Sequence, residues 1–499
     1  FFFSLGFLLA VCAVFAEAIN LWPMPKSVSH GSTSLYLSKE FGFSMKGSGY
    51  KDDGFSRFVD VVDMAHVVDG DVSGTAVLAG LDIALLSSND KVCLDNLDRF
   101  MRLHKQFLGL SMAYSQLYSF NFTTRVFEVH LAPWIIADKP RFPYRGLLID
   151  TARHYIALPK IKHVIDAMAY SNTDVLHWHI VDTESFPLEI PSYPKLWNGA
   201  YSLSERYTVA DADEIVLYAE RRGINVLAEL DVPGHARSWG FGYSSLWTSS
   251  DCQQPLDVSN EFTFQVISGI LSDFSKIFNF KFVHLGGDEV NTSCWRTTPY
   301  IREWLKKERM SESQAYQYFV LRAQKIAESH GYEAVSWEET FNDFGNRISP
   351  PTVVHNWLGG DVAKKVVEAG LKCIVSNQDK WYLDHLDTPW QDFYMNEPLT
   401  NITDPKRQKL VIGGEVCMWG ETADASDLEQ TIWPRAAAAA ERLWTTYKKL
   451  AKDPRQVAAR LARFRCLLNE RGVAAAPLAG PGRTTPCQLG FLLQAVAEL

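Results

Sequence analysis

The adjacent carboxylates Asp288 and Glu289, in the stretch HLGGDEV at residues 284–290, are the pair best suited to chemistry in this sequence. Two carboxyl groups suggest acid and base catalysis on a sugar bond. Neighbouring residues of a strand, however, point to opposite faces of the sheet. A tandem pair is therefore poorly placed to grip one bond from both sides, and its chemistry must differ from that of two carboxylates across a cleft.

The elements that must position this pair alternate between strand and helix signals from residue 145 onwards. Strand-like apolar runs occur at residues 145–150, 175–182, 224–234, 281–289, 332–339, 352–359, 371–378 and 409–421. Segments with helical spacing follow most of them, and only the connections from the fifth to the sixth and from the seventh to the eighth strand look irregular. The alternation predicts an α/β fold, a (β/α)8 TIM barrel, followed by a C-terminal helix at residues 454–473.

Carboxylates gather where the predicted strands end, which is where barrel enzymes place their active sites. The residues at these positions are Asp150, Asp182, Glu229, Asp231, Asp288, Glu289, Glu338 and Glu421. Their concentration is a stronger signal than any single residue. It predicts that Asp288 and Glu289 belong to a site at the carboxyl ends of the strands, although an ion-paired strand end without chemistry is the simpler alternative for the pair.

The N-terminal third of the chain differs from the barrel region. Residues 1–18 are an apolar run that ends in the small-x-small pattern AEA, which predicts a secretory signal peptide, with an uncleaved membrane anchor as the alternative. Residues 19–140 predict a small α+β domain with a helix-like segment at 107–120 and a strand-like one at 125–134. Residues 141–499 then form the barrel and its C-terminal helix.

Bulk properties argue against several classes of partner. The net charge of −9 and the lack of a polybasic run argue against nucleic acid and against anionic lipid. No stretch after the signal reaches the roughly 20 apolar residues of a membrane helix, so no membrane insertion is expected. Three sequons, at Asn121, Asn291 and Asn401, fit a secretory-pathway glycoprotein whose destination is the vacuole or lysosome or the cell exterior.

No metal or other cofactor is expected, because neither a CxxC nor an HExxH spacing occurs. His177 and His179 lie two residues apart on one predicted strand and could be read as metal ligands. No third ligand has metal spacing, which favours the interpretation that both are buried polar residues of the barrel.

Eight stretches in the barrel region together form a specific pattern. They are RGLLIDTARHY, VLHWHIVD, DVPGHARSWG, HLGGDEVNTSCW, WEETF, WYLDHLD, GGEVCMWGE and WPRAAAAAERLW. With them the chain resembles the β-N-acetylhexosaminidases of glycoside hydrolase family 20, in the wording of the plant-type branch. The resemblance implies an exo-acting enzyme that removes terminal GlcNAc or GalNAc from N-acetylhexosamine-terminated glycans and chitooligosaccharides, and it leaves a homodimer open.

The resemblance also implies how an adjacent carboxylate pair works. In this family the 2-acetamido oxygen of the substrate attacks the anomeric carbon and forms an oxazolinium intermediate, so no second carboxylate nucleophile is needed. Glu289 would be the general acid and then the base, and Asp288 would bind the acetamido N–H. Tyr382 would donate to the acetamido oxygen.

Further roles carry over residue by residue. Arg153 and Glu421 would hydrogen-bond ring hydroxyls, whereas Asp182 and His235 would support the acid. The tryptophans that would wall the acetamido group and the sugar are Trp337, Trp357 and Trp419. Asp384 and His385 stand where the family has an Asn-Arg pair in subunits that accept 6-sulfated sugars and an Asp-Leu pair in those that prefer neutral sugars, which implies a preference for unsulfated substrates.

The seven cysteines after the signal include two pairs with family counterparts. The resemblance implies a disulfide between Cys252 and Cys294 beside the active site, and a C-terminal one between Cys466 and Cys487. Cys373 and Cys417 lie in apolar strands and are expected to be buried thiols, which leaves Cys93 without a counterpart. The Asp-Glu-Ser-Tyr-type motif usual in the family's N-terminal domain is not found, so that domain could be incomplete.

Three other functions stay open at this stage. A retaining glycosidase could use Glu229 and Glu289 as a two-carboxylate pair, and would then act on sugars without an acetamide. A secreted sugar-binding barrel with a dead site is a second alternative, although Asp288, Glu289, Arg153 and Tyr382 are all present. Metal-dependent lyase chemistry is the third, and a chelator would test it.

Overall fold

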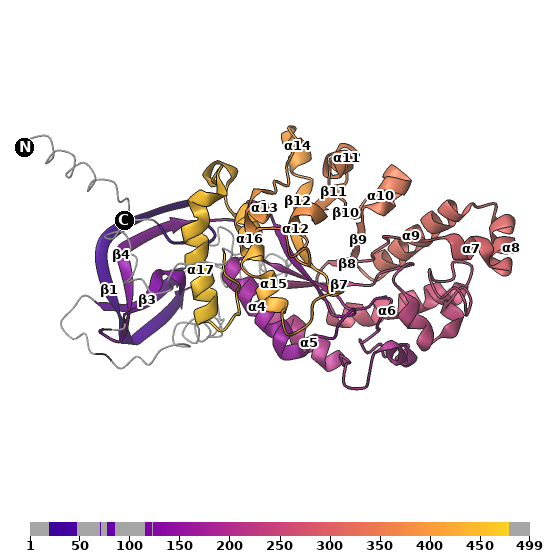
Figure 1. The fold of residues 1–499 in the computed structure, drawn as a ribbon, viewed down its shortest axis with the longest axis horizontal. Helices are drawn as coiled ribbons and strands as arrows, with labels where there is room; N and C mark the ends of the chain where they lie inside the picture. Colours follow the sequence, from indigo (N-terminus) through magenta and orange to yellow (C-terminus); the bar gives the residue numbers. More distant parts are fainter. Residues whose placement is uncertain (1–18, 47–69, 71–76, 85–114, 122, 479–499) are drawn as a thin grey trace, which may run out of the picture.

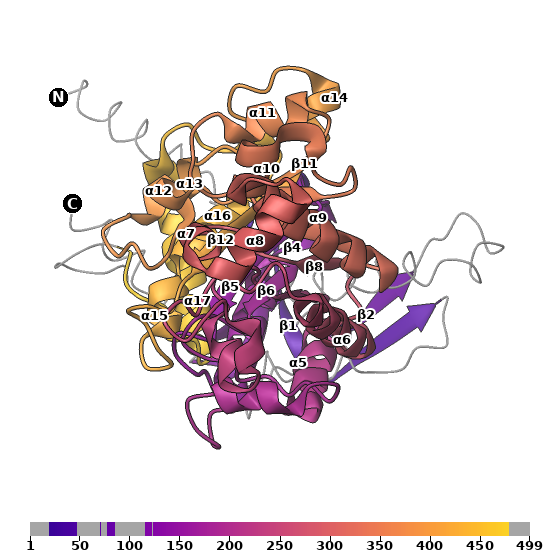
Figure 2. The same cartoon turned by 90° about the vertical axis from the view of Figure 1, so that its right-hand side faces the viewer.

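The centre of the fold is a closed barrel of eight parallel strands (Figures 1 and 2). The computed structural model describes residues 19–46, 70, 77–84, 115–121 and 123–478. The barrel strands are β5 (Tyr144–Asp150), β6 (Val175–His179), β7 (Asn225–Glu229), β8 (Phe282–His284), β9 (Glu333–Trp337), β10 (Val353–Asn356), β11 (Lys372–Val375) and β12 (Val411–Met418). All eight strands lie within the runs predicted from the sequence or within one residue of them, and β12 pairs with β5 to close the barrel, which confirms the predicted fold.

Helices cover the outside of the barrel. They are α4 (Leu158–Ser171), α5 (Val209–Glu220), α6 (Glu261–Ile277), α7 (Ser293–Thr297), α8 (Pro299–Glu308), α9 (Glu312–Ser329), α11 (Val362–Glu368), α15 (Leu428–Ile432), α16 (Arg435–Trp444) and the C-terminal α17 (Ala458–Glu470). Capping boxes start two of them, since Thr208 and Asp211 cap α5, and Ser311 and Gln314 cap α9. None of the described helices has the length and apolar character needed to cross a membrane.

The two connections predicted to be irregular are so. Between β9 and β10 the only α-helix is α10 (Glu339–Phe344), and between β11 and β12 the chain forms three short helices, α12 (Gln378–Trp381), α13 (Trp390–Met395) and α14 (Pro405–Gln408). Both connections begin at strand ends that are followed by aromatic and acidic residues. They therefore supply active-site loops rather than barrel-covering helices.

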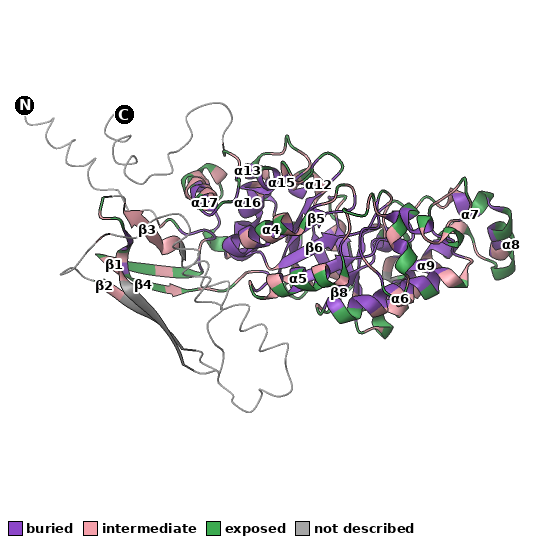
Figure 3. Ribbon diagram, turned by 90° about the horizontal axis from the view of Figure 1, so that it is seen from below, coloured by how far each residue is buried: buried purple, intermediate pink, exposed green. Residues whose placement is uncertain are grey.

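The barrel interior is filled in layers by the inward-facing residue of each strand. The layer at the amino ends of the strands is apolar and consists of Tyr144, Val175, Leu227, Phe282, Val335, Val353 and Ile374. Two residues further along the same strands the inward positions become polar, as at His177, Glu229, His284 and His355, which are fully buried. Figure 3 shows β5 and β6 buried along their length, in contrast to the partly exposed faces of α7 and α8. A charged layer thus lies on an apolar floor.

The N-terminal part forms a second sheet with the strand order β2-β1-β4-β3. Its strands are β1 (Ser27–Lys46), β2 (Val77–Ala84), β3 (Tyr118–Asn121) and β4 (Val126–Ala137). The helix predicted to run to residue 120 is wrong at its end, because Tyr118–Asn121 pairs antiparallel with β4 and tertiary pairing overrides local helical spacing. Residues 85–114, which include the rest of that prediction and Cys93, lie outside the described residues, and the domain boundaries stay predictions.

The N-terminal segment is anchored to the barrel through Trp22. Its fully buried ring stacks on Phe464 of α17, with centroids 6.4 Å apart, and its indole N–H donates to the carbonyl of Ala437 in α16 at 2.9 Å. The guanidinium of Arg460 lies 5.0 Å from the ring centroid and forms a 2.5 Å ion pair with Glu441, which is also buried. Helix α17 stands on the side of the barrel that faces the sheet (Figure 1), and Trp22 fixes the segment that leads into the sheet to this helix.

Replacing Trp22 by Ala should lower the free energy of unfolding by about 3–5 kcal/mol, because the change leaves a large cavity and an unpaired carbonyl. Chemical denaturation measures this value. Trp134 is the matched control, since its half-buried ring hydrogen-bonds within its own strand and contacts only His30 of β1 among the described aromatic rings. Trp134→Ala should cost under about 1 kcal/mol, and equal losses for the two variants would contradict the anchoring role of Trp22.

Candidate active site

The carboxylate pair Asp288-Glu289 lies in a loop and not on a strand. Strand β8 ends at His284, and Gly286, Gly287 and Glu289 follow with φ angles of 60°, 94° and 50°. These left-handed conformations cannot continue a strand, so the predicted strand to residue 289 was too long. The alternation of faces therefore does not apply to the pair. Both carboxylates turn toward His235, whose Nε2 lies 3.6 Å from Asp288 Oδ2 and 3.5 Å from Glu289 Oε2.

The loop adopts this shape because its glycines leave room for Asp231. A Cβ on Gly286 would stand 1.8 Å from Asp231 Oδ1, and the backbone N–H of Gly287 donates to the same oxygen at 3.0 Å. The hydroxyl of Tyr316, from α9, donates to the carbonyl of Gly287. A left-handed Glu289 costs energy that these contacts offset, which is typical of a residue held for function.

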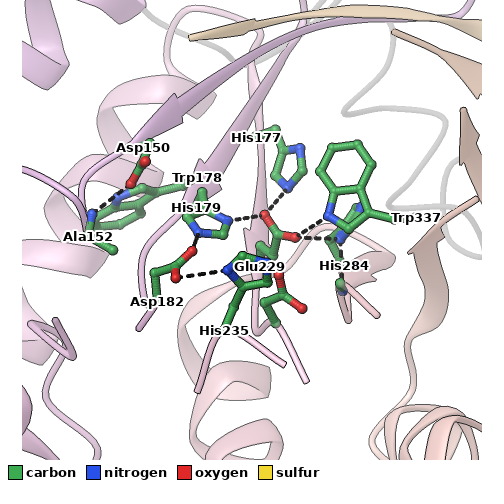
Figure 4. Close-up of polar contacts among 12 residues, drawn as sticks. Asp150, Ala152, His177, Trp178, His179, Asp182, Glu229, His235, His284 and Trp337 are labelled. Carbon is green, nitrogen blue, oxygen red and sulfur yellow. Dashed lines mark hydrogen bonds and ion pairs between the residues drawn. The ribbon is translucent and has the colours of Figure 1, made fainter. Parts of the chain in front are cut away.

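Asp182, which follows β6, connects the basic residues of the site (Figure 4). It is fully buried and accepts from His235 Nδ1 at 3.0 Å and from His179 Nε2 at 2.7 Å, and it pairs with Arg153 at 2.9 Å. His235 has a φ of 48°, so both residues of the His235–Glu289 contact have left-handed backbone conformations. The contact is thus imposed by the folded loops.

Arg153 follows β5 and forms ion pairs with several carboxylates of the site. Its guanidinium lies 3.1 Å from Asp150 and 3.7 Å from Glu421, and it sits 5.3 Å from the ring centroid of Trp419. The side chain of Glu421 is 55% exposed. A buried, multiply paired arginine beside an exposed carboxylate matches the predicted pair of hydroxyl-binding groups in placement.

An aromatic wall faces the carboxylate pair. Trp337, Trp357, Tyr382 and Trp419 form one connected group with centroid distances of 5.9–6.1 Å, and the ring of Trp357 is nearly parallel to Tyr382 at 13°. Burial raises the pKa of Tyr382 well above its ordinary value, so its hydroxyl stays a donor. The wall offers apolar faces and one polar tip.

Two carboxylates position Trp357, namely Glu338, which the sequence analysis placed at a strand end without a role, and Glu339, which it did not single out. Glu338 accepts from the backbone N–H of Trp357 at 2.8 Å, and Glu339 accepts from its indole N–H at 2.9 Å. Burial, with Asp288 nearby, raises the pKa of Glu339 to about 8. Two consecutive glutamates after a strand were the available signal for these roles. Glu184, 3.4 Å from Arg153, was also missed, and its loop position carries no such signal.

Two buried acceptor atoms in the site have no hydrogen-bond partner among the described residues. These are Oδ1 of Asp288 and Oδ1 of Asp384. A buried oxygen without a donor is costly, and binding sites use such atoms to receive ligand donors. Asp288 is therefore a free acceptor beside His235, and Asp384 is a second one, whose other oxygen, Oδ2, lies 3.9 Å from Nε2 of His385.

Residues 142–447 match the sequence profile of the glycosyl hydrolase family 20 catalytic domain. That range covers the whole barrel and every site residue described above. The chain belongs to glycosyl hydrolase family 20. It is 60% identical to beta-hexosaminidase 3 of Arabidopsis thaliana over 509 aligned residues, which cover 96% of this chain and 94% of the relative. Beta-hexosaminidase 1 of the same plant is 59% identical, with 73% and 68% covered.

Solved structures agree with this membership. The chitobiase of Flavobacterium johnsoniae is 26% identical and has a TM-score of 0.76, with 91% of this chain and 73% of that chain covered. An exo-β-N-acetylglucosaminidase of Vibrio harveyi has a TM-score of 0.79 at 21% identity, which shows the shared fold. The family 20 chain is accordingly a glycoside hydrolase of the β-N-acetylhexosaminidase type, in the plant-type branch, as the resemblance implied.

Glu229 is not placed to act as a nucleophile in this family 20 barrel. Its carboxylate is fully buried and accepts hydrogen bonds from Nδ1 of His179 at 2.5 Å and from the indole N–H of Trp337 at 3.0 Å. Ring nitrogens of His177 and His284 lie 3.1 and 2.9 Å from the same carboxylate. The two-carboxylate alternative therefore lacks an accessible second carboxylate here. The same contacts account for His177 and His179 as buried polar residues, although such clusters could also hold an ion.

One predicted disulfide is present in the described part of the chain. Cys252 and Cys294 are bonded and join the loop after β7 to the loop after β8, while Cys373 and Cys417 are buried thiols as predicted. Cys466 is buried in α17 and disulfide-bonded, and Cys487 lies outside the described residues.

The three predicted sequons differ in their surroundings. Asn291 and Asn401 are exposed, and Asn121 is half buried and donates to Glu128 at 2.5 Å. Exposure favours glycosylation of Asn291 and Asn401 over that of Asn121, and glycosylation stays a prediction for all three.

Charge sharing sets the protonation of the carboxylate pair. The hydrogen bond from His235 lowers the pKa of Glu289, although partial burial opposes this. Burial raises the pKa of Asp288, and burial together with Asp288 raises that of Asp231 further. The proton of this second pair therefore resides on Asp231, and Asp288 stays ionised as an acceptor.

Replacing His235 by Gln should move the alkaline limb of kcat/KM to higher pH by about one unit, because the cation that lowers the pKa of Glu289 is lost and its acid form persists longer. The pH dependence of aryl N-acetylglucosaminide hydrolysis measures the shift. His154→Gln is the control, since this exposed histidine contacts only the carbonyl of Gly420 among the described groups. A limb that moves to lower pH in His235→Gln would contradict the assignment.

Proposed function

We propose that the enzyme releases terminal, non-reducing β-linked GlcNAc or GalNAc from glycans by a retaining, substrate-assisted mechanism. The observation that carries the proposal is that Asp288 and Glu289 lie side by side against the imidazole of His235, with Asp288 Oδ1 buried and unpartnered among the described residues. A ring-attached acetamide supplies both the N–H that this oxygen lacks and the internal nucleophile that the site does not offer.

The acetamido group would lie between Asp288 and Tyr382. Ionised Asp288 would accept its N–H, and the Tyr382 hydroxyl would donate to its carbonyl oxygen, while Trp337 and Trp357 would enclose its methyl group. Holding the carbonyl oxygen near the anomeric carbon replaces a bimolecular attack by an intramolecular one. As the oxazolinium forms, the negative charge of Asp288 would stabilise the positive charge that develops on the acetamide nitrogen.

Glu289 would supply the leaving-group proton and then deprotonate the attacking water. Its side chain is 61% exposed, in contrast to 13% for Asp288, so it reaches the solvent-facing side where a leaving group and water must pass. His235 would steady this carboxyl through both steps, since its imidazolium favours the carboxylate that remains after protonation of the leaving group. Arg153 and Glu421 would hold the ring hydroxyls.

We further place the protein in the secretory pathway, because the Cys252–Cys294 disulfide requires an oxidising compartment. The signal peptide prediction falls on residues 1–18, which lie outside the described residues. The vacuole or lysosome and the cell exterior are both compatible with this placement. A homodimer stays a prediction.

Stepwise fluorination of the substrate acetamide should lower kcat/KM progressively, by on the order of 10²-fold or more for the trifluoroacetamide, because fluorine withdraws electrons from the attacking oxygen. Aryl glucosides, which lack the acetamide, should not be hydrolysed. Rates that do not change across the series, or a covalent adduct trapped with a 2-fluoro sugar, would overturn the proposed mechanism and favour an enzyme nucleophile.

A 6-sulfate on the sugar should reduce kcat/KM strongly, because Asp384 is a half-buried carboxylate at the position that the family resemblance assigns to the 6-substituent. Two like charges about 5 Å apart repel by about 3 kcal/mol at an effective dielectric near 20. Burial raises the pKa of Asp384, so the group is neutral over more of the acidic range and the discrimination should narrow as pH falls.

Kinetics on aryl GlcNAc and its 6-sulfate at two pH values measure this preference. Asp384→Asn should raise the rate on the sulfated substrate selectively. Asp387→Asn, three residues along the same loop, is the matched control and should leave the ratio of the two rates unchanged. Equal rates on the two substrates in the unaltered enzyme would show that Asp384 does not read charge.

A further inference from the structure

A row of buried side chains continues from the active site into the barrel (Figure 4). Beyond Asp182, His179 donates from Nδ1 to Glu229 at 2.5 Å. Glu229 lies 3.1 Å from Nε2 of His177, and Nδ1 of His177 donates to Glu415 at 2.7 Å. All four side chains are at most 1% exposed. The mechanism above uses none of them.

Each histidine of the row stands between two carboxyl groups. His177 lies between Glu415 and Glu229, His179 lies between Glu229 and Asp182, and His235 lies between Asp182 and the catalytic pair. His179 bonds carboxylates through both nitrogens, and an imidazole can donate from both only as an imidazolium. His177 donates to Glu415 through Nδ1, while its Nε2 lies 3.1 Å from Glu229 without a hydrogen bond, so the two nearby carboxylates favour its charge. With these imidazoles protonated, anion and cation alternate from Glu415 to Glu289.

Two other buried histidines of the barrel provide an internal comparison. His284 faces Glu229 at 2.9 Å with one nitrogen and His355 at 3.3 Å with the other, and His355 faces Ser376 with its second nitrogen. Burial lowers the pKa of both His284 and His355. Burial also opposes the charge of His177, but Glu415 and Glu229 outweigh it and raise its pKa to about 9. The second carboxylate makes the difference.

We propose that Glu229, and behind it Glu415, are positioning residues for the catalytic acid, which hold His179 and His177 protonated and thereby set the charge that Asp182 presents to His235 beside Glu289. The inference rests on the proposed role of Glu289 as the acid. Glu229 and Glu415 are fully buried and touch no substrate. They act only through the histidines and Asp182.

The direction of the effect follows from the shared charge of Asp182, which Arg153, His179 and His235 divide among them. In Glu229→Gln, His179 loses the carboxylate that holds its proton and becomes neutral. Asp182 is then less neutralised, and its negative charge, which opposes ionisation of Glu289, raises the pKa of that acid.

The remaining groups that face the row are accounted for. Trp337 and His284 face Glu229, and Tyr144 donates to Glu415 at 2.5 Å, with His355 at 3.9 Å from the same carboxylate. Asp150 adds negative charge near His179. At the catalytic end, Arg153 and Asp182 face Glu289, and Asp288 and Asp231 face His235.

The test is the pH dependence of kcat/KM for aryl GlcNAc hydrolysis by the full chain. Glu229→Gln should move the alkaline limb to higher pH by up to about one unit, in the same direction as the shift expected for His235→Gln. Glu415→Gln should shift it in the same direction by less, since it lies one carboxylate further along the row. Glu441→Gln is the matched control. This fully buried glutamate lies on the outer helix α16 and pairs with Arg460 of α17, so its replacement should leave the alkaline limb unmoved.

An unmoved limb in Glu229→Gln with a reduced kcat would overturn the inference and leave Glu229 a purely structural residue, and a shift equal to that of Glu441→Gln would do the same. Glu289→Gln separates this from failure of the proposed function. If its alkaline limb persists on an activated aryl substrate, Glu289 is not the acid, whatever Glu229→Gln shows.

A second measurement does not depend on the variants folding. In protein labelled with ¹⁵N at histidine, the ring nitrogens of His177, His179 and His235 should all show the doubly protonated state at neutral pH, while those of His284 and His355 show neutral rings. A neutral ring at His177 or His179 would break the alternation of charge and overturn the inference.

Discussion

The carboxylate of Asp182 is the contact on which the active site depends. It is fully buried, and burial of an unpaired charge would be prohibitive, so it must have cations around it. Three different chain segments supply them, through Arg153, His179 and His235. One buried anion therefore aligns Arg153 with His235, the partner of Glu289, and the positions of both follow from the same electrostatic requirement.

The barrel makes this arrangement possible because its interior is layered. Apolar residues close the amino ends of the strands, and the charged middle layer stands on them out of reach of water. In so dry a place each charge must meet an opposite one, which gives the side chains a single arrangement. The loops above can then hold Glu289 and His235 in left-handed conformations, since the buried polar layer below them is rigid.

The barrel and most residues of the site could be predicted from the sequence, but the shape of the loops and the contacts between buried polar residues could not. Apolar runs located all eight strands, and carboxylates at strand ends pointed to the residues that the structure brings together. The position of Asp288 and Glu289 was misread because apolar spacing does not reveal where a strand stops, whereas three left-handed residues after His284 end it. Glu415, His284 and His355 went unnoticed as single polar residues within apolar strands, which only the closed barrel brings to one axis. Glu339 was missed because only the fold brings it to the indole of Trp357.

The disulfide between Cys252 and Cys294 spans the two loops that carry His235 and Glu289. Cys294 follows Glu289 by only five residues, so the bond ties the segment after Glu289 to the segment that follows His235. The barrel itself does not need this link, because its strands close without it. Thiol reduction should therefore release the two loops first and leave the barrel standing, which makes catalysis more sensitive than folding to the redox state of the surrounding compartment. Chains retained in a reducing environment would then be folded but catalytically inactive.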